Sequence, residues 1–445
     1  MNPVPIVIVA ISIILMITAI ALDWKIKFKS AVFGLYWVFC LIGAITCLLY
    51  YFIAPGVEPI NLGEVFLSNA NINPLKILVI FISCTSISVV LDKIGFFSYI
   101  AAIILTKSKS SQKKLFFSFS AIIAILTIFT SNDILILTFT PFICYFSKNA
   151  KINPLPYIIS EFVCANVWSM FFFIDNPTNI YMCTTFDISF IEYAVNMAVP
   201  TILSGIFSTF LVYFIFRKTL NQKIEIQDVE IVKPDRTFLT IGLIGLGIMV
   251  LFMAISNYIP GVELWYVPLV CSVATYIALL VSMIIKKGGY SILWKALKGL
   301  PYALIPFLLS MSIFIVSLEN AGFIGEIASF LSNQHMFVTG LISFGLGNLL
   351  NNIPMTMMFT NTLAAFTNHT ETSFFTTVYG VVAASNITAL LTPIGSLAGI
   401  MFMKILKENE VKYSFGRFVF YGIFISIPTI CLALAAIYFM PTVIM

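Results

Sequence analysis

Long apolar runs separated by short polar stretches occupy most of the 445-residue chain. Most of the runs are near or above the roughly 20 residues that cross a bilayer as a helix, and the alternating pattern of a membrane β-barrel is absent. The pattern predicts an all-α polytopic membrane protein with about 10 transmembrane helices. The expected spans are residues 4–22, 31–53, 74–105, 195–216, 237–256, 264–285, 300–331 and 415–439, with two broken helices at 155–186 and 372–406.

Two further apolar regions each carry a polar group at their centre. In the first, arms at 115–130 and 134–147 flank Ser131-Asn132-Asp133, and in the second the arms flank Asn351-Asn352. The arms are short, and non-helical backbone deep in a membrane is tolerated only where protein or a water-filled cavity surrounds it. We therefore expect two re-entrant hairpins with these polar residues at their tips.

The polar groups repeat along the chain at a constant offset. Asn132 lies 220 residues before Asn352, and Asn166 lies 220 residues before Asn386. The same offset relates the two broken helices, which indicates an internal duplication. Each half has five crossings and one hairpin, an odd number of crossings, so the second half should be inverted in the membrane. The expected divisions are a first inverted repeat at 1–216, a cytoplasmic linker at 217–236 and a second inverted repeat at 237–445.

Basic residues lie mostly in the loops on one side of the expected spans. By the positive-inside rule that side is cytoplasmic, and of the 24 Lys and Arg residues only Lys76 and Lys93 fall elsewhere. We expect a multi-pass protein of the cell (inner) membrane with both termini extracytoplasmic. The net charge of +5 then reflects topology and does not indicate nucleic-acid binding. Met1–Leu22 lacks a basic n-region and a cleavage site, so it is interpreted as the first span rather than a signal peptide.

The sequence contains no pattern that indicates an enzyme. The eight cysteines include no C-x-x-C pair, and His335 and His369 stand alone in loops, so neither a metal site nor a bound cofactor is expected. No Gly-x-x-x-x-Gly-Lys-Ser/Thr loop for ATP is present. Inverted repeats with broken helices are typical of secondary transporters, so we expect transport driven by a gradient of H⁺ or Na⁺.

Polar residues at the tips and breaks are the expected binding residues. A carboxamide both donates and accepts hydrogen bonds, so it can hold an oxyanion, a neutral hydroxide or a sodium ion. The alternative is that these residues only cap helix ends and hold the bundle together. The candidate substrate- and ion-binding residues are Asn132, Asp133, Asn166, Asp175, Asn176, Pro177, Thr178, Asn179, Asn351, Asn352, Asn386, Thr392, Pro393, Gly395 and Ser396.

Three carboxylates, Asp133, Glu161 and Asp175, belong only to the first repeat. A buried carboxylate suits either proton carriage or sodium binding, and a Na⁺ site at Asn132 and Asp133 is one form of the second role. Glu161 could instead lie at the membrane interface near the cytoplasmic end. Because the deep ionisable residues are mostly acidic, a neutral or weakly charged substrate fits more easily than a multivalent anion.

Asp92 and Glu319 are further coupling candidates, since each precedes a Gly-Phe pair in its repeat. A simpler alternative for Asp92 is an ion pair with Lys93. The sequence by itself leaves both alternatives open.

Five motifs of this chain resemble those of the arsenite permease (ArsB-type) family. That family belongs to an ion-transporter superfamily that also contains sodium/proton antiporters and citrate or dicarboxylate carriers. The motifs are Leu91–Phe97, Asn132-Asp133 with Leu137–Pro141, Phe186–Tyr193, Asn351–Pro354 and Thr392–Ala398. Two stretches depart from the arsenite branch: Asn386–Leu391 lacks its acidic residue and glycine, and Asp175–Asn179 is similar to the Asp-Pro-Thr-Asn of other members.

The resemblance implies efflux of arsenite or antimonite driven by the proton motive force. The alternatives are a sodium-coupled carrier of organic anions such as citrate or dicarboxylates, a sodium/proton antiporter, and a structural or receptor membrane protein without transport. The resemblance also implies a small oxyanion or organic anion as substrate, and it leaves a homodimer and a separate ATPase subunit open.

Overall fold

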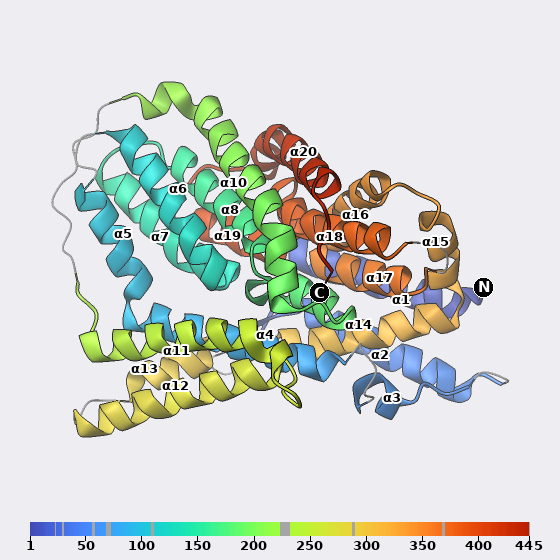
Figure 1. The fold of residues 1–445 in the computed structure, drawn as a ribbon. Helices are drawn as coiled ribbons and strands as arrows, with labels where there is room; N and C mark the ends of the chain where they lie inside the picture. Colours follow the sequence, from blue (N-terminus) through green and yellow to red (C-terminus); the bar gives the residue numbers. More distant parts are fainter. Residues whose placement is uncertain are drawn as a thin grey trace.

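The structure, a computed structural model, describes the whole chain except residues 23, 29–30, 56–57, 68–72, 108–110, 223–231, 287–289, 367–369 and 445. The described chain is almost entirely helical (Figure 1). Within it, nine helices are long and apolar enough to cross a membrane, or ten if one bent pair forms a single span. The expected all-helical membrane protein is confirmed.

Helices of the first half follow the expected spans closely. One element was not expected: strands β1 (Lys25–Phe28) and β2 (Ala31–Gly34) form an antiparallel ribbon, so the next helix begins at Tyr36 rather than near residue 31. The helices are α1 (Pro3–Ala21), α2 (Tyr36–Ile53), α3 (Leu62–Leu67), α4 (Pro74–Ile94), α5 (Phe96–Lys107), α6 (Gln112–Phe129), α7 (Asn132–Asn149), α8 (Leu155–Val167), α9 (Pro177–Thr185) and α10 (Phe190–Leu220).

The second half repeats this order of helices, and the short helix α13 takes the place that α3 has in the first half. Its helices are α11 (Arg236–Ile255), α12 (Tyr266–Ile285), α13 (Ser291–Lys298), α14 (Leu304–Asn320), α15 (Phe323–Leu331), α16 (Met336–Leu350), α17 (Asn352–Ala364), α18 (Glu371–Ile387), α19 (Leu397–Glu408) and α20 (Phe415–Phe439). Between the halves, α10 extends to Leu220, four residues into the expected linker. Residues 223–231 of that linker lie outside the described residues.

A left-handed glycine divides the longest expected span of each half into two helices. Gly95 has φ of 91° between α4 and α5, and Gly322 has φ of 79° between α14 and α15. Glycine adopts this backbone conformation without the steric penalty that a Cβ atom brings. The α14–α15 pair bends by 80° at its break. The bend explains how residues 304–331, too many for one straight crossing, are accommodated.

Each half contains a helical hairpin with its tip inside the protein. Helices α6 and α7 meet at Ser131, which is 3% exposed, and α16 and α17 meet at Asn351, which is 1% exposed. Helix α5 packs on α7 at one end of the molecule, whereas α15 packs on α17 at the other end (Figure 1). The two hairpins thus occupy opposite ends, as expected for inverted repeats.

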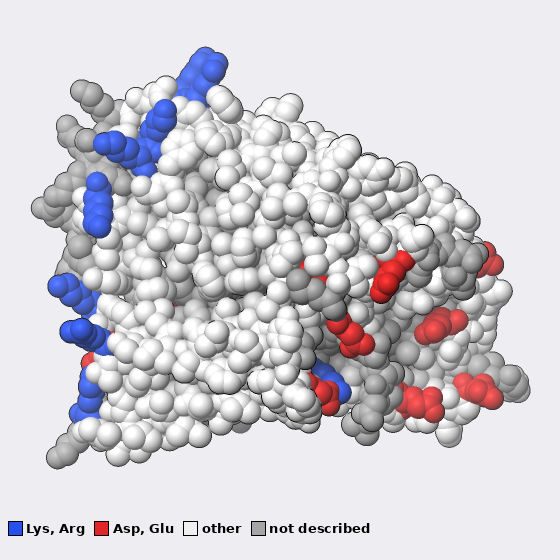
Figure 2. All heavy atoms as spheres, in the orientation of Figure 1, with Lys and Arg blue, Asp and Glu red and all other residues white. Residues whose placement is uncertain are grey.

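Charged side chains are segregated between the two ends. Figure 2 shows most Lys and Arg at one end of the molecule, where α5, α13, the carboxyl end of α10 and the amino end of α11 lie. Asp and Glu gather toward the opposite end. The two bases that the sequence placed elsewhere each have an acidic partner: Lys76 pairs with Glu263, and Lys93 pairs with Asp92. Because Lys76 donates to it, the pKa of the Glu263 carboxyl is lowered.

Helix α20 packs directly against the second broken helix through a glycine. A Cβ atom on Gly422 would lie 2.5 Å from the Leu390 carbonyl oxygen and 2.8 Å from that of Leu391. Both obstacles are backbone atoms, which cannot rotate away. Gly416, six residues earlier in the same helix, has nothing within 4 Å of the corresponding position.

Gly422→Ala is therefore expected to lower stability, because overpacking against fixed atoms typically costs about 1–3 kcal/mol. Gly416→Ala is the matched control, and it should leave stability unchanged or raise it, since alanine favours a helix by up to about 1 kcal/mol. The measurement is the thermal melting midpoint of the purified protein in detergent. Equal midpoints for the two variants would contradict the close packing described here.

Candidate functional site

The first broken helix is interrupted over a longer stretch than the sequence suggested. Between α8 and α9 lie two short 3₁₀ turns, at Trp168–Met170 and Phe173–Asp175. Asn176 then adopts an extended conformation, as residues before proline commonly do, and its side chain accepts a hydrogen bond from the Thr178 N–H. The polar residues predicted here are thus held at the start of α9.

The second broken helix has the same construction at the same offset. Its 3₁₀ turns are Thr388–Leu390 and Pro393–Gly395, and Ser396 caps α19 by accepting from the Gly399 N–H at 3.0 Å. The two prolines differ in position, because Pro177 is the first residue of α9 whereas Pro393 opens a 3₁₀ turn. The breaks are therefore equivalent although their prolines are not.

Asn386 on α18 joins the second half to the first break. Its Oδ1 accepts hydrogen bonds from Ser169 Oγ at 2.7 Å and from Asn176 Nδ2 at 2.8 Å. Its Nδ2 donates to Asn179 Oδ1 at 2.7 Å and to the Val382 carbonyl oxygen at 2.8 Å. The bonds use the full capacity of a carboxamide, and the side chain is 1% exposed. We call Asn386, Ser169, Asn176 and Asn179 the amide network.

Thr178 extends this network toward α18. Its hydroxyl donates to Asn176 Oδ1 at 2.9 Å, and Ser385 Oγ donates to the Thr178 hydroxyl at 3.3 Å. Asn166, the counterpart of Asn386, bonds within its own half instead, because its Nδ2 donates to the Phe162 carbonyl oxygen at 2.8 Å. The symmetry of the sequence is therefore not matched by symmetric contacts.

The hairpin tips lie beside the breaks of their own halves. Asn351 has φ of 78°, and its Nδ2 donates to the Ile394 carbonyl oxygen at 2.9 Å. Asn132 is buried at the start of α7, where its Oδ1 accepts from the Asp133 N–H at 2.8 Å, and Asn352 is buried at the equivalent start of α17. The amino ends of α7, α9, α17 and α19 all begin at tips or breaks, and helix amino ends favour negative or electron-rich groups.

At the second break, Asn348 forms hydrogen bonds with two threonines. Thr392 Oγ1 donates to Asn348 Oδ1 at 2.9 Å, and Asn348 Nδ2 donates to Thr388 Oγ1 at 2.6 Å. A Cβ atom on Gly395 would lie 2.6 Å from the Thr388 carbonyl oxygen, so this position requires glycine. Asn348 and Ser169 were not predicted from the sequence. Their counterparts in the other half, Ile128 and Ala389, are apolar, so matching the two halves did not single them out.

Asp175 is the most unusual side chain of the first break. It is 2% exposed, and neither carboxylate oxygen has a hydrogen-bond partner. Buried polar groups nearly always have partners, because leaving one unpaired costs about 1–3 kcal/mol. Asp133, which is half-buried at the first tip, lies close enough to Asp175 for their carboxyl groups to interact electrostatically. This pair of carboxyl groups could bind a proton or a cation.

The other three carboxylates among the predicted site residues lie apart from the amide network. Glu161 is fully buried inside the protein. Asp92 bonds to Lys93 Nζ at 2.7 Å and to Thr138 Oγ1 at 2.7 Å, which is the simpler alternative that the sequence allowed. Glu319 is exposed and lines a polar cleft of about 340 Å³ beside Tyr181.

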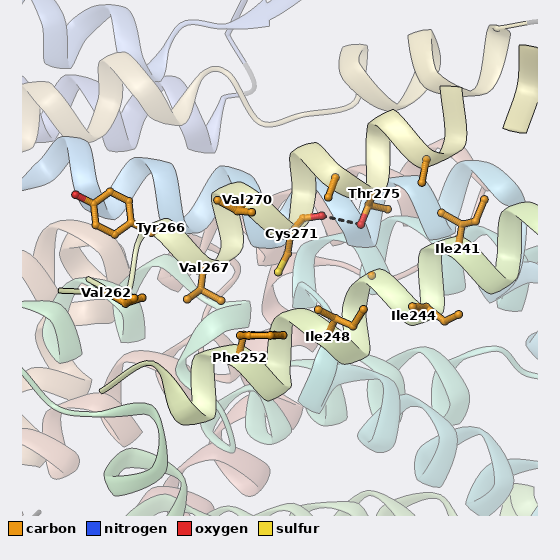
Figure 3. Close-up of a pocket in the computed structure, with 13 residues that line it drawn as sticks. Ile241, Ile244, Ile248, Phe252, Val262, Tyr266, Val267, Val270, Cys271 and Thr275 are labelled. Carbon is orange, nitrogen blue, oxygen red and sulfur yellow. Dashed lines mark hydrogen bonds between the residues drawn. The ribbon is translucent and has the colours of Figure 1, made fainter. Parts of the chain in front are cut away.

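An apolar groove near the surface does not suit a polar substrate. It lies between α11 and α12, with a volume of about 590 Å³, and its walls are aliphatic and aromatic (Figure 3). The Thr275 hydroxyl in this groove already donates to the Cys271 carbonyl oxygen at 2.7 Å. Within the described residues, no group of three or more His, Cys, Asp or Glu side chains could hold a metal ion.

The fold and these broken helices define a polytopic membrane transporter. A family model described as "Arsenical pump membrane protein" matches residues 9–440, so the chain belongs to the arsenical pump membrane protein family. It is 25% identical over 444 residues to the arsenical pump membrane protein of Escherichia coli K12, covering 95% of this chain and 97% of that protein. A Bacillus subtilis protein whose name also refers to an arsenical pump is 27% identical over 379 residues, covering 79% of this chain and 84% of that one.

A solved structure supports the same architecture. The crystal structure of the Alcanivorax borkumensis YdaH transporter matches with a TM-score of 0.56, covering 99% of this chain and 98% of that chain. At 12% sequence identity, this likeness concerns the fold alone.

The amide network leads to a test with a natural control. Asn386→Ala removes three bonds to the first break, and side-chain hydrogen bonds inside membrane proteins average about 0.6 kcal/mol, so we expect a loss of about 2 kcal/mol. Asn166→Ala, at the matched position, should lower stability less, because Asn166 Nδ2 donates only to a carbonyl oxygen of its own helix, α8. Melting midpoints of the two variants decide this. A larger loss for Asn166→Ala would show that the network does not hold the first break.

Proposed function

We propose that this protein is a secondary active transporter that exports arsenite or antimonite from the cytoplasm, driven by the proton motive force. The observation that carries the proposal is Asp175, a buried carboxylate without partners at the first break. It lies in a chain that belongs to the arsenical pump family. The relatives named above supply the substrate class, and the site supplies a group suited to the driving ion.

The charge of the interior favours a neutral substrate. Among the described residues, the buried charged side chains are Glu161, Asp175 and Glu192, and no lysine or arginine is buried. A multivalent anion would meet only acidic groups, whose repulsion is strong where water is excluded. The neutral trihydroxide of trivalent arsenic or antimony avoids this repulsion, and its hydroxyl groups can both donate to and accept from carboxamides.

Asp175 and Asp133 are proposed to carry the coupling ion. A carboxylate stripped of water strongly favours either a proton or a bound cation, and no described side chain bonds to Asp175 to supply one. Protonation would neutralise Asp175 without further ligands, whereas Na⁺ would need several oxygens, with Asn132 and Asp133 as first candidates. We take the proton as the coupling ion.

The hairpins and breaks are proposed to provide alternating access. Helix α6 packs on the first break and α16 on the second, so each hairpin can move with the broken helix of its own half. We propose that substrate and ion bind at the interface of the two halves, as in other transporters built from inverted repeats.

The first test is arsenite accumulation in everted membrane vesicles under an imposed proton gradient, with and without sodium. We expect accumulation that a protonophore collapses and that does not require sodium. Accumulation dependent on sodium, or no accumulation in vesicles that contain folded protein, would reject proton-driven efflux and favour the sodium-linked alternatives.

In the same assay, Asp175→Asn should reduce gradient-driven accumulation to the level of vesicles without the protein, because asparagine cannot carry a proton. Asp133→Asn should show the same loss. Arsenite exchange between the two sides, which moves no net charge or proton, should persist in both variants. Glu326→Gln, an exposed change on α15, is the matched control and should transport normally. Normal gradient-driven transport by Asp175→Asn would exclude it as the coupling residue.

The charge segregation in Figure 2 supports a proposal for the orientation in the membrane. We place the Lys and Arg end in the cytoplasm, and both termini outside it. Alkaline phosphatase fused to the carboxyl terminus should then be active in cells, whereas green fluorescent protein at the same position should stay dark. The opposite pair of results would invert the assignment.

A further inference from the structure

A second buried carboxylate, Glu161, lies outside the amide network. It sits on α8, is 0% exposed, and accepts a hydrogen bond from Thr140 Oγ1 on α7 at 2.8 Å through Oε2. Its other oxygen, Oε1, has no partner. The described titratable groups that interact with this carboxyl are the thiols of Cys144 on α7 and Cys164 on α8. No described charged group of the neighbouring α6, α7, α10 or α18 pairs with it.

Glu161 lies between a water-accessible cleft and the centre of the protein. The cleft has a volume of about 490 Å³ and is lined by Cys144, Lys148, Leu155 and Arg417 among others. Cys144, which is 5% exposed, lines this cleft and also lies close enough to the Glu161 carboxyl to interact with it electrostatically. Along α8, Glu161 is about 9 Å beyond Leu155 and about 7.5 Å short of Asn166, at 1.5 Å per residue.

Polar side chains continue around this position. Ser120 Oγ and Ser160 Oγ lie 2.6 Å apart between α6 and α8, and Cys164 Sγ lies 3.6 Å from Thr209 Oγ1 on α10. Buried ionisable residues inside a membrane protein commonly mark ion pathways, because their burial is costly. In the duplicated half the position of Glu161 is occupied by Val381, so the inverted fold does not need a carboxylate here.

We propose that Glu161 is the proton-exchange site that connects the central carboxylates with the cytoplasmic cleft. This inference rests on the proposed function and adds a route for the proton. During efflux of the substrate, a proton leaves Asp175 and forms the O–H bond at Oε1 of Glu161. The Glu161 carboxyl then releases that proton to water in the cleft beside Cys144, and the ionised carboxylate remains bonded to Thr140.

The first measurement is the rate of gradient-driven arsenite accumulation in everted vesicles as a function of bath pH, since the bath faces the cytoplasmic surface. Glu161→Gln should lower this rate by at least about tenfold, a modest part of what a positioned proton carrier contributes. The remaining rate should no longer depend on bath pH. Arsenite exchange should stay normal, and Glu161→Asp should recover part of the coupled rate with a displaced pH profile.

The matched control is Glu192→Gln, which changes another buried glutamate, at the start of α10. It should keep the wild-type rate and bath-pH profile. A wild-type rate and profile for Glu161→Gln would overturn the proposal, and so would a loss of arsenite exchange in both Glu161→Gln and Glu161→Asp, which indicates a structural role.

A second measurement does not depend on transport. Infrared spectra of the purified protein in lipid vesicles should contain a protonated-carboxyl band that shifts when the bath is changed to D₂O. Part of this band should be absent from Glu161→Gln and present in Glu192→Gln. If the wild type accumulates no arsenite but the band exchanges and depends on Glu161, the proposed function fails and the exchange site stands. If the bands of Glu161→Gln and the wild type are identical, the exchange site fails.

Discussion

The structure depends on satisfying the polar groups of two helices that are broken inside the protein. A broken helix leaves N–H and C=O groups unpaired, and hydrocarbon offers no water to bond them. Here side chains supply the partners: Asn179 Nδ2 donates to the Ser169 carbonyl oxygen at 2.9 Å, and Asn351 Nδ2 donates to the Ile394 carbonyl oxygen at 2.9 Å. Because Asn386 also bonds to the first break, the stability of that break depends on the opposite half of the chain.

The duplicated scaffold carries unequal chemistry. At matched positions the first break has Asp175 and Asn179, whereas the second has Gly395 and Gly399. A Cβ atom on Gly399 would lie 2.6 Å from the Pro393 carbonyl oxygen, so the second break is closed tightly by backbone. Hydrogen-bonding and ionisable groups therefore concentrate in the first break. Of the two matched breaks, both within the described residues, the first carries a carboxylate and the second does not.

Acidic side chains at different depths have different surroundings, and these decide what each can do. Asp92 has Lys93 and Thr138 as partners, Glu319 is exposed to a cleft, and Asp175 has no bonded partner. An ion-paired or solvated carboxylate is stable in its ionised form, whereas one without partners gains greatly from a proton or cation. Glu161 stands between these cases, because Thr140 donates a hydrogen bond to Oε2 whereas Oε1 has no partner.

The sequence by itself determined the helical membrane class, the spans, the hairpin tips and the duplication, since bilayer thickness imposes apolar length locally and polar residues inside such runs stand out. It also identified Asp175 and Asn386, because both are polar in otherwise apolar segments. Only the tertiary structure decided that Asn386 bonds to Asn176, 210 residues earlier, and that Asn348 and Ser169 take part. The tertiary structure also showed that Asp92 forms an ion pair with Lys93, whereas neither carboxylate oxygen of Asp175 has a hydrogen-bond partner. A hydrogen bond between distant residues depends on how the helices pack, and no local pattern records that packing.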